Sequence, residues 1–286
     1  MRIHLLGCGT PTADANRFGS SYVVQIKDDY LMFDCGPATT FKLAKSKIKP
    51  TWINYLFFTH HHFDHDVDYP CFLLSRWNES IGNEEELKVF GPNLTEKITY
   101  RLFDEKEGAF AHDWIARINH PLSLNAHTSR GGTLPRKPLE VNVKDISPGL
   151  ICNTKNWSVT AAPAEHVEPW LDSLAYRLDS PEGSIVITGD TRPCKTVSNL
   201  SKNADILINL CTSIQEDVEG TPEAEYMCST IDAAKVANEA NVKKLILVHQ
   251  SPYLDHPGKT ERAISDISSI YKGEIIWGEE LMYVDV

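Results

Sequence analysis

The densest group of potential metal ligands in this chain of 286 residues is the segment 59–65, Thr-His-His-His-Phe-Asp-His. It contains the pattern His-x-His-x-Asp-His, formed by His60, His62, Asp64 and His65. Imidazole nitrogens and carboxylate oxygens are ligands for zinc, iron and manganese. Four such groups this close along the chain cannot easily all reach one ion, so the pattern predicts two metals. His61 falls out of step with the others and is expected to point away.

The apolar run Tyr55-Leu56-Phe57-Phe58 directly before the cluster predicts a buried strand that ends at Thr59. Open α/β folds place their ligand sites at the C-terminal ends of strands. The competing interpretation is a solvated polar loop whose histidines contact nothing. The position directly after a buried strand, together with the clustering of His and Asp, favours a metal or catalytic site instead.

Three further potential ligands, His166, Asp190 and His249, each come shortly after a predicted strand elsewhere in the chain. Taken singly, such a histidine is more often structural, and an aspartate after a glycine is more often a turn residue. Their shared position at strand ends matches that of the first cluster. This coincidence makes all three candidates for the same metal site.

Composition and charge bound the class of protein. The chain is 42% hydrophobic and 23% charged, as in globular proteins, and 28 basic against 39 acidic side chains give a net charge of −11. An acidic chain has no overall attraction for nucleic acid or anionic membranes, although metals or a local basic patch would supply positive charge. Neither a signal peptide nor an apolar run of 18 residues is found, so no membrane contact is expected. Seven scattered cysteines without a Cys-x-x-Cys pair fit a reducing compartment, which predicts a cytoplasmic protein.

Apolar periodicity and turn residues predict alternating strands and helices along the whole chain. Strands are expected at residues 3–7, 21–26, 30–33, 55–58, 87–90, 157–161, 174–178, 184–188, 205–210 and 244–248. Helices are expected at residues 39–47, from about 95 to 105, and at 231–240 and 259–272, with a terminal hairpin or paired strands over 273–286. Two β-rich halves with interleaved helices favour a sheet-on-sheet core covered by helices. Since no Pro- or Ser-rich linker separates the halves, a single domain over residues 1–286 is expected.

The stretch 108–138 is the least regular part of the sequence and is expected to be an irregular insertion. It contains His112, His120, His127 and two adjacent glycines. Long irregular stretches are usually functional or mobile. The segment is therefore a candidate substrate lid or dimer contact, and a homodimer is expected.

The chain resembles the metallo-β-lactamase superfamily over nearly its whole length. The resemblance is carried, in family order, by His60-x-His62-x-Asp64-His65, His166, Gly189-Asp190-Thr191 and His249. It implies an α+β fold, the αββα metallo-β-lactamase-type sandwich of two mixed β-sheets flanked by helices. The site would lie at the edge between the two sheets.

The same resemblance implies two divalent metal ions per chain. One ion would be held by His60, His62 and His166, and the other by Asp64, His65 and His249. Asp190 would bridge the two ions. Zinc is the first expectation, and manganese or iron also accept this ligand set.

Within the superfamily the chain looks most similar to the ribonuclease Z and related phosphodiesterase branch, through residues 6–11, 30–36, 175–178, 188–191 and 243–252. By resemblance to that branch, Asp34 would not bind metal itself but would contact the metal ligands. Carboxylates in such positions fix the tautomers of ligand histidines. Two departures stand out. Asn209-Leu210-Cys211-Thr212 occupies the place of His-Glu-Ala-Thr in ribonuclease Z, and Cys228 occupies the place of a second histidine. No clear glycine- and proline-rich arm for tRNA is found either.

These observations predict a dinuclear metal-dependent hydrolase. The leading expectation is a phosphodiesterase that acts through a metal-bound hydroxide on a small, cyclic or nucleotide phosphate ester, with Asp64 as the catalytic residue. Candidates for the missing proton donor are His112, His120, His127 and His256. Candidates for a phosphate clamp are Arg130, Arg136, Arg192 and Lys195. Each of these, taken singly, is more often a structural or solvated residue.

Three alternatives remain open. The first is a ribonuclease Z-like endonuclease that processes tRNA 3′ ends, with RNA as its partner; the acidic charge and the two departures disfavour it. The second is a lactone or thioester hydrolase on the same metal centre, which the loss of the histidines somewhat favours. The third is a non-enzymatic binding protein with a vestigial site, which the intact ligand set disfavours.

Overall fold

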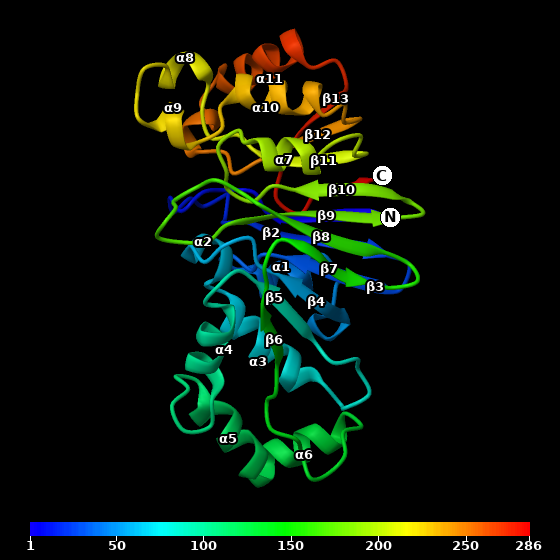
Figure 1. Ribbon diagram of the computed structural model, residues 1–286. Coiled ribbons are helices and arrows are strands. Elements are labelled where there is room, and N and C mark those ends of the chain that lie inside the picture. The colour runs from blue at the N-terminus through cyan, green and yellow to red at the C-terminus, as the bar shows by residue number, and fades with distance from the viewer.

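In the computed structural model, which describes residues 1–286, two seven-stranded β-sheets pack face to face between two layers of helices (Figure 1). The first sheet has the order β14 (Tyr283–Asp285), β1 (Arg2–Gly7), β2 (Ser21–Ile26), β3 (Asp29–Phe33), β4 (Ile53–Phe57), β5 (Lys88–Gly91) and β6 (Asn142–Asp145). The second has the order β13 (Glu274–Trp277), β12 (Lys244–Val248), β11 (Ile206–Leu210), β10 (Gly183–Ile187), β9 (Leu174–Ser180), β8 (Ser158–Pro163) and β7 (Gly149–Asn153). Both sheets combine antiparallel with parallel pairs. The predicted sandwich of two mixed sheets is therefore confirmed.

Strands in the middle of the second sheet are apolar on both faces. In β11, Ile206 and Ile208 pack into the cluster between the two sheets, whereas Leu207 packs toward the outer helices. The neighbouring β12 alternates in the same way, with Ile246 toward the first sheet and Leu245 toward the helices. A strand buried on both faces needs a continuous apolar run, which explains why the sequence pattern identified these strands.

Helices cover the outer face of each sheet (Figure 1). The helices and 3₁₀ turns are α1 (Thr39–Lys45), η1 (Pro50–Trp52), α2 (Phe63–Asp66), α3 (Tyr69–Glu79), α4 (Thr95–Phe103), α5 (Ala111–Asn119), α6 (Pro121–Ser129), α7 (Lys195–Leu200), α8 (Gln215–Val218), α9 (Glu223–Tyr226), α10 (Thr230–Glu239), η2 (Pro252–Asp255) and α11 (Lys259–Ile270). Phe72 of α3 and Trp114 of α5 belong to the apolar cluster on the first sheet. Ala233 of α10 and Ile267 of α11 belong to the cluster on the second sheet. None of these helices is both long and apolar enough to cross a membrane.

Two expectations from the sequence were wrong. The stretch 108–138 is not irregular over most of its length, because it contains α5 and α6. Trp114 and Ile118, four residues apart in α5, point the same way into the first sheet's helix-side cluster, a spacing that was overlooked. Residues 273–286 do not form a hairpin either, since β13 pairs with β12 in one sheet and β14 pairs with β1 in the other. The single-domain organisation and the homodimer remain predictions.

The C-terminal ends of several strands meet at one edge of the sandwich, where hydrogen bonds join the two sheets. The amide of Leu174, at the start of β9, donates to the carbonyl of Thr59 just beyond β4, with an N···O distance of 2.9 Å. The hydroxyl of Tyr176 donates to the carbonyl of Phe58 at 2.7 Å. Because Tyr176 is fully buried, this bond forms in a nonpolar setting where its loss would leave a costly unpaired carbonyl. These bonds hold the two sheets together at this edge, which fixes the positions from which the loops extend.

Phe57 tests how far the packing between the sheets determines stability. Its ring is fully buried and stacks on Phe33 and Phe90, with centroid distances of 5.1 and 5.4 Å. We expect Phe57→Ala to lower the free energy of unfolding by about 3–5 kcal/mol, because it removes the ring and leaves a cavity. Urea unfolding would measure the change. Leu150→Ala, on a residue that is 63% exposed, should change the free energy by no more than about 0.5 kcal/mol and serves as the control. Equal losses in both variants would contradict this account of the core.

Candidate metal centre

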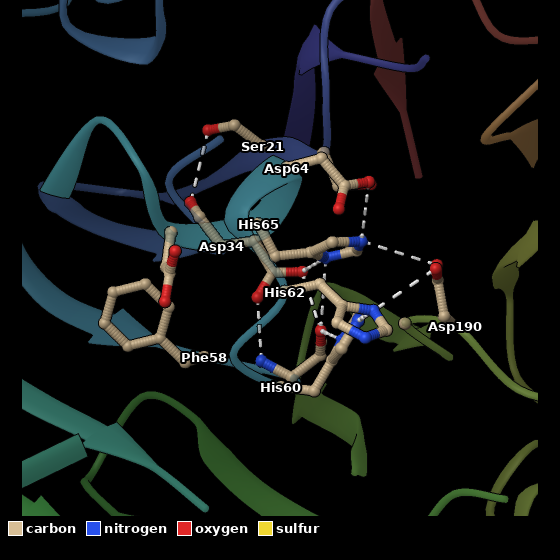
Figure 2. Close-up of polar contacts among 12 residues, drawn as sticks. Ser21, Asp34, Phe58, His60, His62, Asp64, His65 and Asp190 are labelled. Carbon is tan, nitrogen blue, oxygen red and sulfur yellow. Dashed lines mark hydrogen bonds and ion pairs between the residues drawn. The ribbon is translucent and has the colours of Figure 1, made fainter. Parts of the chain in front are cut away.

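Five segments bring seven potential metal ligands to the shared edge of the two sheets. His60 and His62 lie in the loop after β4, and Asp64 and His65 lie in the short helix α2 that follows. His166 follows β8, Asp190 follows β10 and His249 follows β12. The imidazoles of the first loop point toward the carboxylate of Asp190 (Figure 2). All seven side chains predicted from the sequence therefore lie together.

The seven side chains form two groups that share Asp190. The first group is His60, His62, His166 and Asp190, and the second is Asp64, His65, Asp190 and His249. Within each group, one potential ligand atom per residue lies within 4.8 Å of every other. An aspartate that belongs to both groups is the geometry expected of a bridging carboxylate.

Distances in the first group fit a cation at its centre. The Nδ1 atom of His62 lies 3.1 Å from Nε2 of His60 and 3.2 Å from Nε2 of His166. Oδ2 of Asp190 lies 4.0 Å from Nε2 of His60 and 3.8 Å from Nε2 of His166. Zinc–nitrogen bonds of about 2.0–2.1 Å place neighbouring tetrahedral ligands about 3.3–3.4 Å apart. The observed separations lie around that value.

The second group has the same dimensions. Oδ2 of Asp64 lies 3.5 Å from Nε2 of His65 and 3.4 Å from Nε2 of His249. Oδ1 of Asp190 lies 3.5 Å from Nε2 of His65, and Oδ2 of Asp190 lies 3.1 Å from Nε2 of His249. Charge-assisted hydrogen bonds between imidazolium and carboxylate are usually about 2.7–2.9 Å long. These contacts are longer than that, as expected when a cation lies between the atoms.

Unpaired buried atoms provide a separate test of the fit. Both carboxylate oxygens of Asp64, Nε2 of His65 and Nε2 of His249 are buried and have no hydrogen-bond partner. Native proteins pair nearly all of their buried polar groups, because an unpaired one costs free energy. Oδ2 of Asp64 and the Nε2 atoms of His65 and His249 are also the atoms that approach one another and Asp190 in the second group. The residues therefore fit a metal ion, which would be the missing partner.

Asp34 fixes the ring of the ligand His65 through the ring nitrogen that does not face the metal centre. Its Oδ2 accepts a hydrogen bond of 2.7 Å from Nδ1 of His65, and Figure 2 shows the ring of His65 reaching on toward Asp190. With the proton on Nδ1, Nε2 of His65 is left as the free ligand atom. Thr59 fixes the carboxylate of Asp34 through its amide at 2.7 Å and its hydroxyl at 2.8 Å. Sequence reasoning named Asp34 but missed Thr59, whose only signal was its position directly before the first ligand.

Unusual backbone conformations orient two of the ligands, Asp190 and His249. Gly189, directly before Asp190, has φ +58°, and a Cβ atom there would lie 2.6 Å from Cβ of Thr59. Only glycine permits this approach, which brings Asp190 against the first loop. His249 has φ +58°, a left-handed conformation in which histidine occurs more often than most residues. Such strain is usually retained where a site requires it.

The carboxylates dominate the electrostatics of the metal-free site. Burial alone would lower the pKa of His249, but the neighbouring carboxylates of Asp190 and Asp64 raise it to about 9. Burial would also lower the pKa of His65, yet Asp190 and Asp34 raise it well above the ordinary value. In return, although burial opposes it, His249 and His65 hold the pKa of Asp190 well below its usual range. When no metal is bound, protonated His65 and His249 thus supply positive charge that balances the carboxylates.

His61 lies outside both groups, as expected. Its Nδ1 is 3.1 Å from a carboxylate oxygen of Asp66, and its Nε2 is 2.8 Å from the hydroxyl of Thr95. These contacts fix its ring between α2 and α4. The imidazole therefore has a structural role next to the metal ligands.

Most candidates for proton transfer and phosphate binding lie elsewhere. His112, His120 and His127 belong to α5, α6 and the turn between them, at the far end of the molecule from α2 (Figure 1). Arg130 and Arg136 donate to main-chain carbonyls at the end of α3. His256 is exposed, and no contact joins it to the seven ligands. Lys195 begins α7.

Arg192 is the exception among these candidates. It follows Asp190 by two residues, and its Nε donates to the carboxylate of Glu165 at 2.9 Å. Both side chains are more than 40% exposed. Glu165 directly precedes His166, so this ion pair joins two of the ligand-bearing segments at the surface.

The two departures from ribonuclease Z contact each other. The amide Nδ2 of Asn209 donates to the carbonyl of Leu210 at 2.8 Å and to Sγ of Cys228 at 3.2 Å. Both side chains are buried, and burial raises the pKa of the Cys228 thiol well above its usual value. Neither group can therefore donate or accept a proton readily near neutral pH. This part of the protein contains no substitute for the missing histidines.

Comparisons with known proteins identify a family and similar folds. A family model described as "Metallo-beta-lactamase superfamily" matches residues 15–219. A protein named ribonuclease Z from Mycobacterium sp. (strain KMS) is 30% identical over 294 aligned residues, covering 100% of this chain and 96% of the relative. The metallo-β-lactamase fold protein YhfI from Bacillus subtilis superposes with a TM-score of 0.75 at 17% identity, covering 100% of this chain and 99% of that one. The short form of human tRNase Z superposes with a TM-score of 0.67 at 21% identity and the same coverage.

Removal of single ligands should change the amount of metal bound. We expect His62→Ala to lose the ion of the first group, and Asp190→Ala to lose metal from both groups because its carboxylate belongs to each. Elemental analysis of dialysed protein would measure the stoichiometry, and circular dichroism would confirm that the fold is kept. His61→Ala is the matched control, since it removes an adjacent imidazole outside both groups. A metal loss in His61→Ala equal to that in His62→Ala would refute the assignment.

The metal-free protein should lose stability as the pH rises. Since the pKa of His249 is raised to about 9 in the folded state and is about 6.5 in an unfolded chain, its ion pairs stabilise the fold fully below pH 6.5. That contribution disappears as the pH rises through about 9. Urea unfolding in the presence of a chelator between pH 6 and 9.5 would show the decline, which His249→Asn should reduce. Stability that stays level or rises over this range would contradict the electrostatic account.

Proposed function

The chain belongs to the metallo-β-lactamase superfamily, in its ribonuclease Z-like branch, and we propose that it is a metal-dependent phosphodiesterase that cleaves RNA. The observation that carries the proposal is the pair of four-residue groups that share Asp190. Full-length likeness to proteins named ribonuclease Z supports RNA as the substrate class. This choice differs from the leading expectation from the sequence, a small phosphate ester, because the relatives favour the ribonuclease alternative.

In this proposal, His60, His62 and His166 hold one divalent cation, and Asp64, His65 and His249 hold the other. Asp190 holds both. Two divalent cations, when bound, lower the pKa of water and neutralise charge on a phosphoryl group. Asp34 and Thr59 act as positioning residues, since they keep the proton of His65 on Nδ1 and its Nε2 free. Zinc is the first choice of metal, with manganese and iron as the others.

Asp64 has the geometry to orient the attacking water. Its Oδ2 lies closest to His65 and His249, and its Oδ1, like Oδ2, is buried without any hydrogen-bond partner. One oxygen can therefore bind metal while the other accepts a hydrogen bond from the water. The phosphorus–oxygen bond that breaks leaves a phosphate on one fragment and a hydroxyl on the other.

A second candidate is a small phosphate ester, cyclic or nucleotide, with a weakly basic leaving group. The specific observation in its favour is the contact between Asn209 and Cys228, which are not titratable near neutral pH although the ribonuclease Z branch has histidines at these positions. A leaving group of low pKa departs without protonation, whereas a ribose hydroxyl benefits from an acid. The net charge of −11 also favours a small substrate over a long polyanion.

The two candidates differ in which substrate is cleaved. We expect the metal-loaded protein to cut a transcript of a tRNA with a 3′ trailer at a kcat/KM at least about tenfold above that for bis-p-nitrophenyl phosphate. Gel analysis of end-labelled RNA would locate the cut and show a hydroxyl and a phosphate terminus, with no 2′,3′-cyclic phosphate, because water is the nucleophile. Asp190→Ala provides the background rate of contaminating nucleases.

Turnover of bis-p-nitrophenyl phosphate or cyclic nucleotides without cleavage of RNA would establish the second candidate in place of the first. Hydrolysis restricted to lactones or thioesters would overturn both. Equal RNA cleavage by the wild type and by Asp190→Ala would show that the observed nuclease is not this protein.

A further inference from the structure

Two large aromatic side chains are exposed beside the ligands. Phe63 lies between His62 and Asp64 in the sequence and is 56% exposed, and Trp170 lies four residues after His166 and is 84% exposed. Aromatic rings are usually mostly buried, because each can remove a large apolar area from water. Two of them exposed on the segments that carry the metal ligands indicate a surface used for binding.

The position of Phe63 is fixed by its helix. Its neighbours Asp64 and His65 are buried and turn toward the metal centre, whereas Phe63 and Val67, one helical turn apart, lie on the outer face of α2. Val67 is 50% exposed. The side chains of Phe63 and Val67 thus form a small exposed apolar surface next to the ligands Asp64 and His65.

Trp170 is held at the tip of a closed loop between β8 and β9. The amide of Ala164 donates to the carbonyl of Ser173 at 2.9 Å and closes the loop, and the amide of Trp170 donates to the carbonyl of Val167 at 3.0 Å within it. The loop lies against the first metal-binding loop, since Nε2 of His166 is 3.2 Å from Nδ1 of His62 (Figure 1). Trp170 therefore lies on a second segment that carries a metal ligand, separate from the segment of Phe63.

Arg192 is a positively charged residue close to the ligand Asp190 in the sequence. Arg192 is paired only with Glu165 among side chains and is 42% exposed, so its remaining N–H groups face solvent. An exposed guanidinium and exposed aromatic rings together are a combination that binds the phosphates and bases of single strands.

We propose that Phe63 and Trp170 are stacking platforms for unpaired nucleobases next to the scissile phosphate, with Arg192 as a cation that binds a neighbouring phosphate. Stacking on aromatic rings tolerates any base and requires that the base be unpaired. The proposal rests on the proposed function, a phosphodiesterase that acts on RNA. It goes beyond that function by assigning recognition of the nucleotides next to the cut to these two side chains.

A binding measurement tests the stacking without turnover. Tryptophan fluorescence of the metal-loaded wild type should be quenched by adenosine 5′-monophosphate and not by ribose 5-phosphate, which lacks the base. Trp170→Phe should remove most of that quenching. Trp52→Phe should keep it, because Trp52 lies before the N-terminal end of β4, away from the ligands, and is also partly exposed. Equal quenching by both phosphates, or unchanged quenching in Trp170→Phe, would overturn the proposal.

A kinetic measurement tests the role of the rings in cleavage. Trp170→Ala and Phe63→Leu should each lower kcat/KM for the RNA by roughly tenfold, the scale of one lost stacking contact, while Trp52→Ala stays unchanged. On an RNA with abasic riboses next to the cut, wild type and Trp170→Ala should be equal. Metal content is measured for each variant, so that loss of metal in Phe63→Leu is recognised.

The outcomes separate the two proposals. RNA cleavage that Trp170→Ala and Phe63→Leu leave unchanged would overturn the stacking proposal and leave the ribonuclease function intact. Quenching by adenosine 5′-monophosphate through Trp170, without RNA cleavage, would overturn the function and support base stacking. Dissociation of a dimer by Trp170→Ala, with quenching unchanged, would identify the exposed ring as a subunit contact and overturn the stacking proposal.

Discussion

Burial of unpaired charge and lone pairs at the edge between the sheets is the constraint on which the rest of the structure depends. Asp64, His65 and His249 place ligand atoms in a buried space with no partner from the protein. Without a compensating partner, each such atom would cost roughly 1–3 kcal/mol, a large share of the stability of an ordinary domain. Two bound cations would remove the cost, whereas protonated histidines do so only in part. Metal binding would therefore add to the stability of the fold.

The two sheets make this arrangement possible because both place the C-terminal ends of parallel strands at the same edge. Ligands follow β4 of the first sheet and β10 and β12 of the second, and Asp34 follows β3. Continuous apolar packing between the sheets fixes those ends relative to one another. The loops that extend from these ends can then differ freely while all seven ligands are kept.

The ligands could be predicted from the sequence because each is a rare residue type at the end of an apolar strand, and the sandwich followed from the apolar runs and the family resemblance. Sequence reasoning could not find the support of Asp34 by Thr59, since a threonine before a histidine has no distinctive pattern. It missed α5, where the spacing of Trp114 and Ile118 was hidden among polar residues. It offered a hairpin or paired strands for residues 273–286 without assigning β13 and β14 to different sheets, because strand composition does not say which sheet a strand enters. Exposure of Trp170 and Phe63 became visible only in three dimensions.

The central claim is that Asp190 holds two cations at once. A crystal structure of the metal-loaded protein, recorded at the absorption edge of the bound metal, tests this most directly through anomalous scattering. We expect two peaks about 3.5–4 Å apart, one contacting each group of ligands and both contacting Asp190. A single peak, or peaks that leave Asp64 and His249 without a metal contact, would contradict the account.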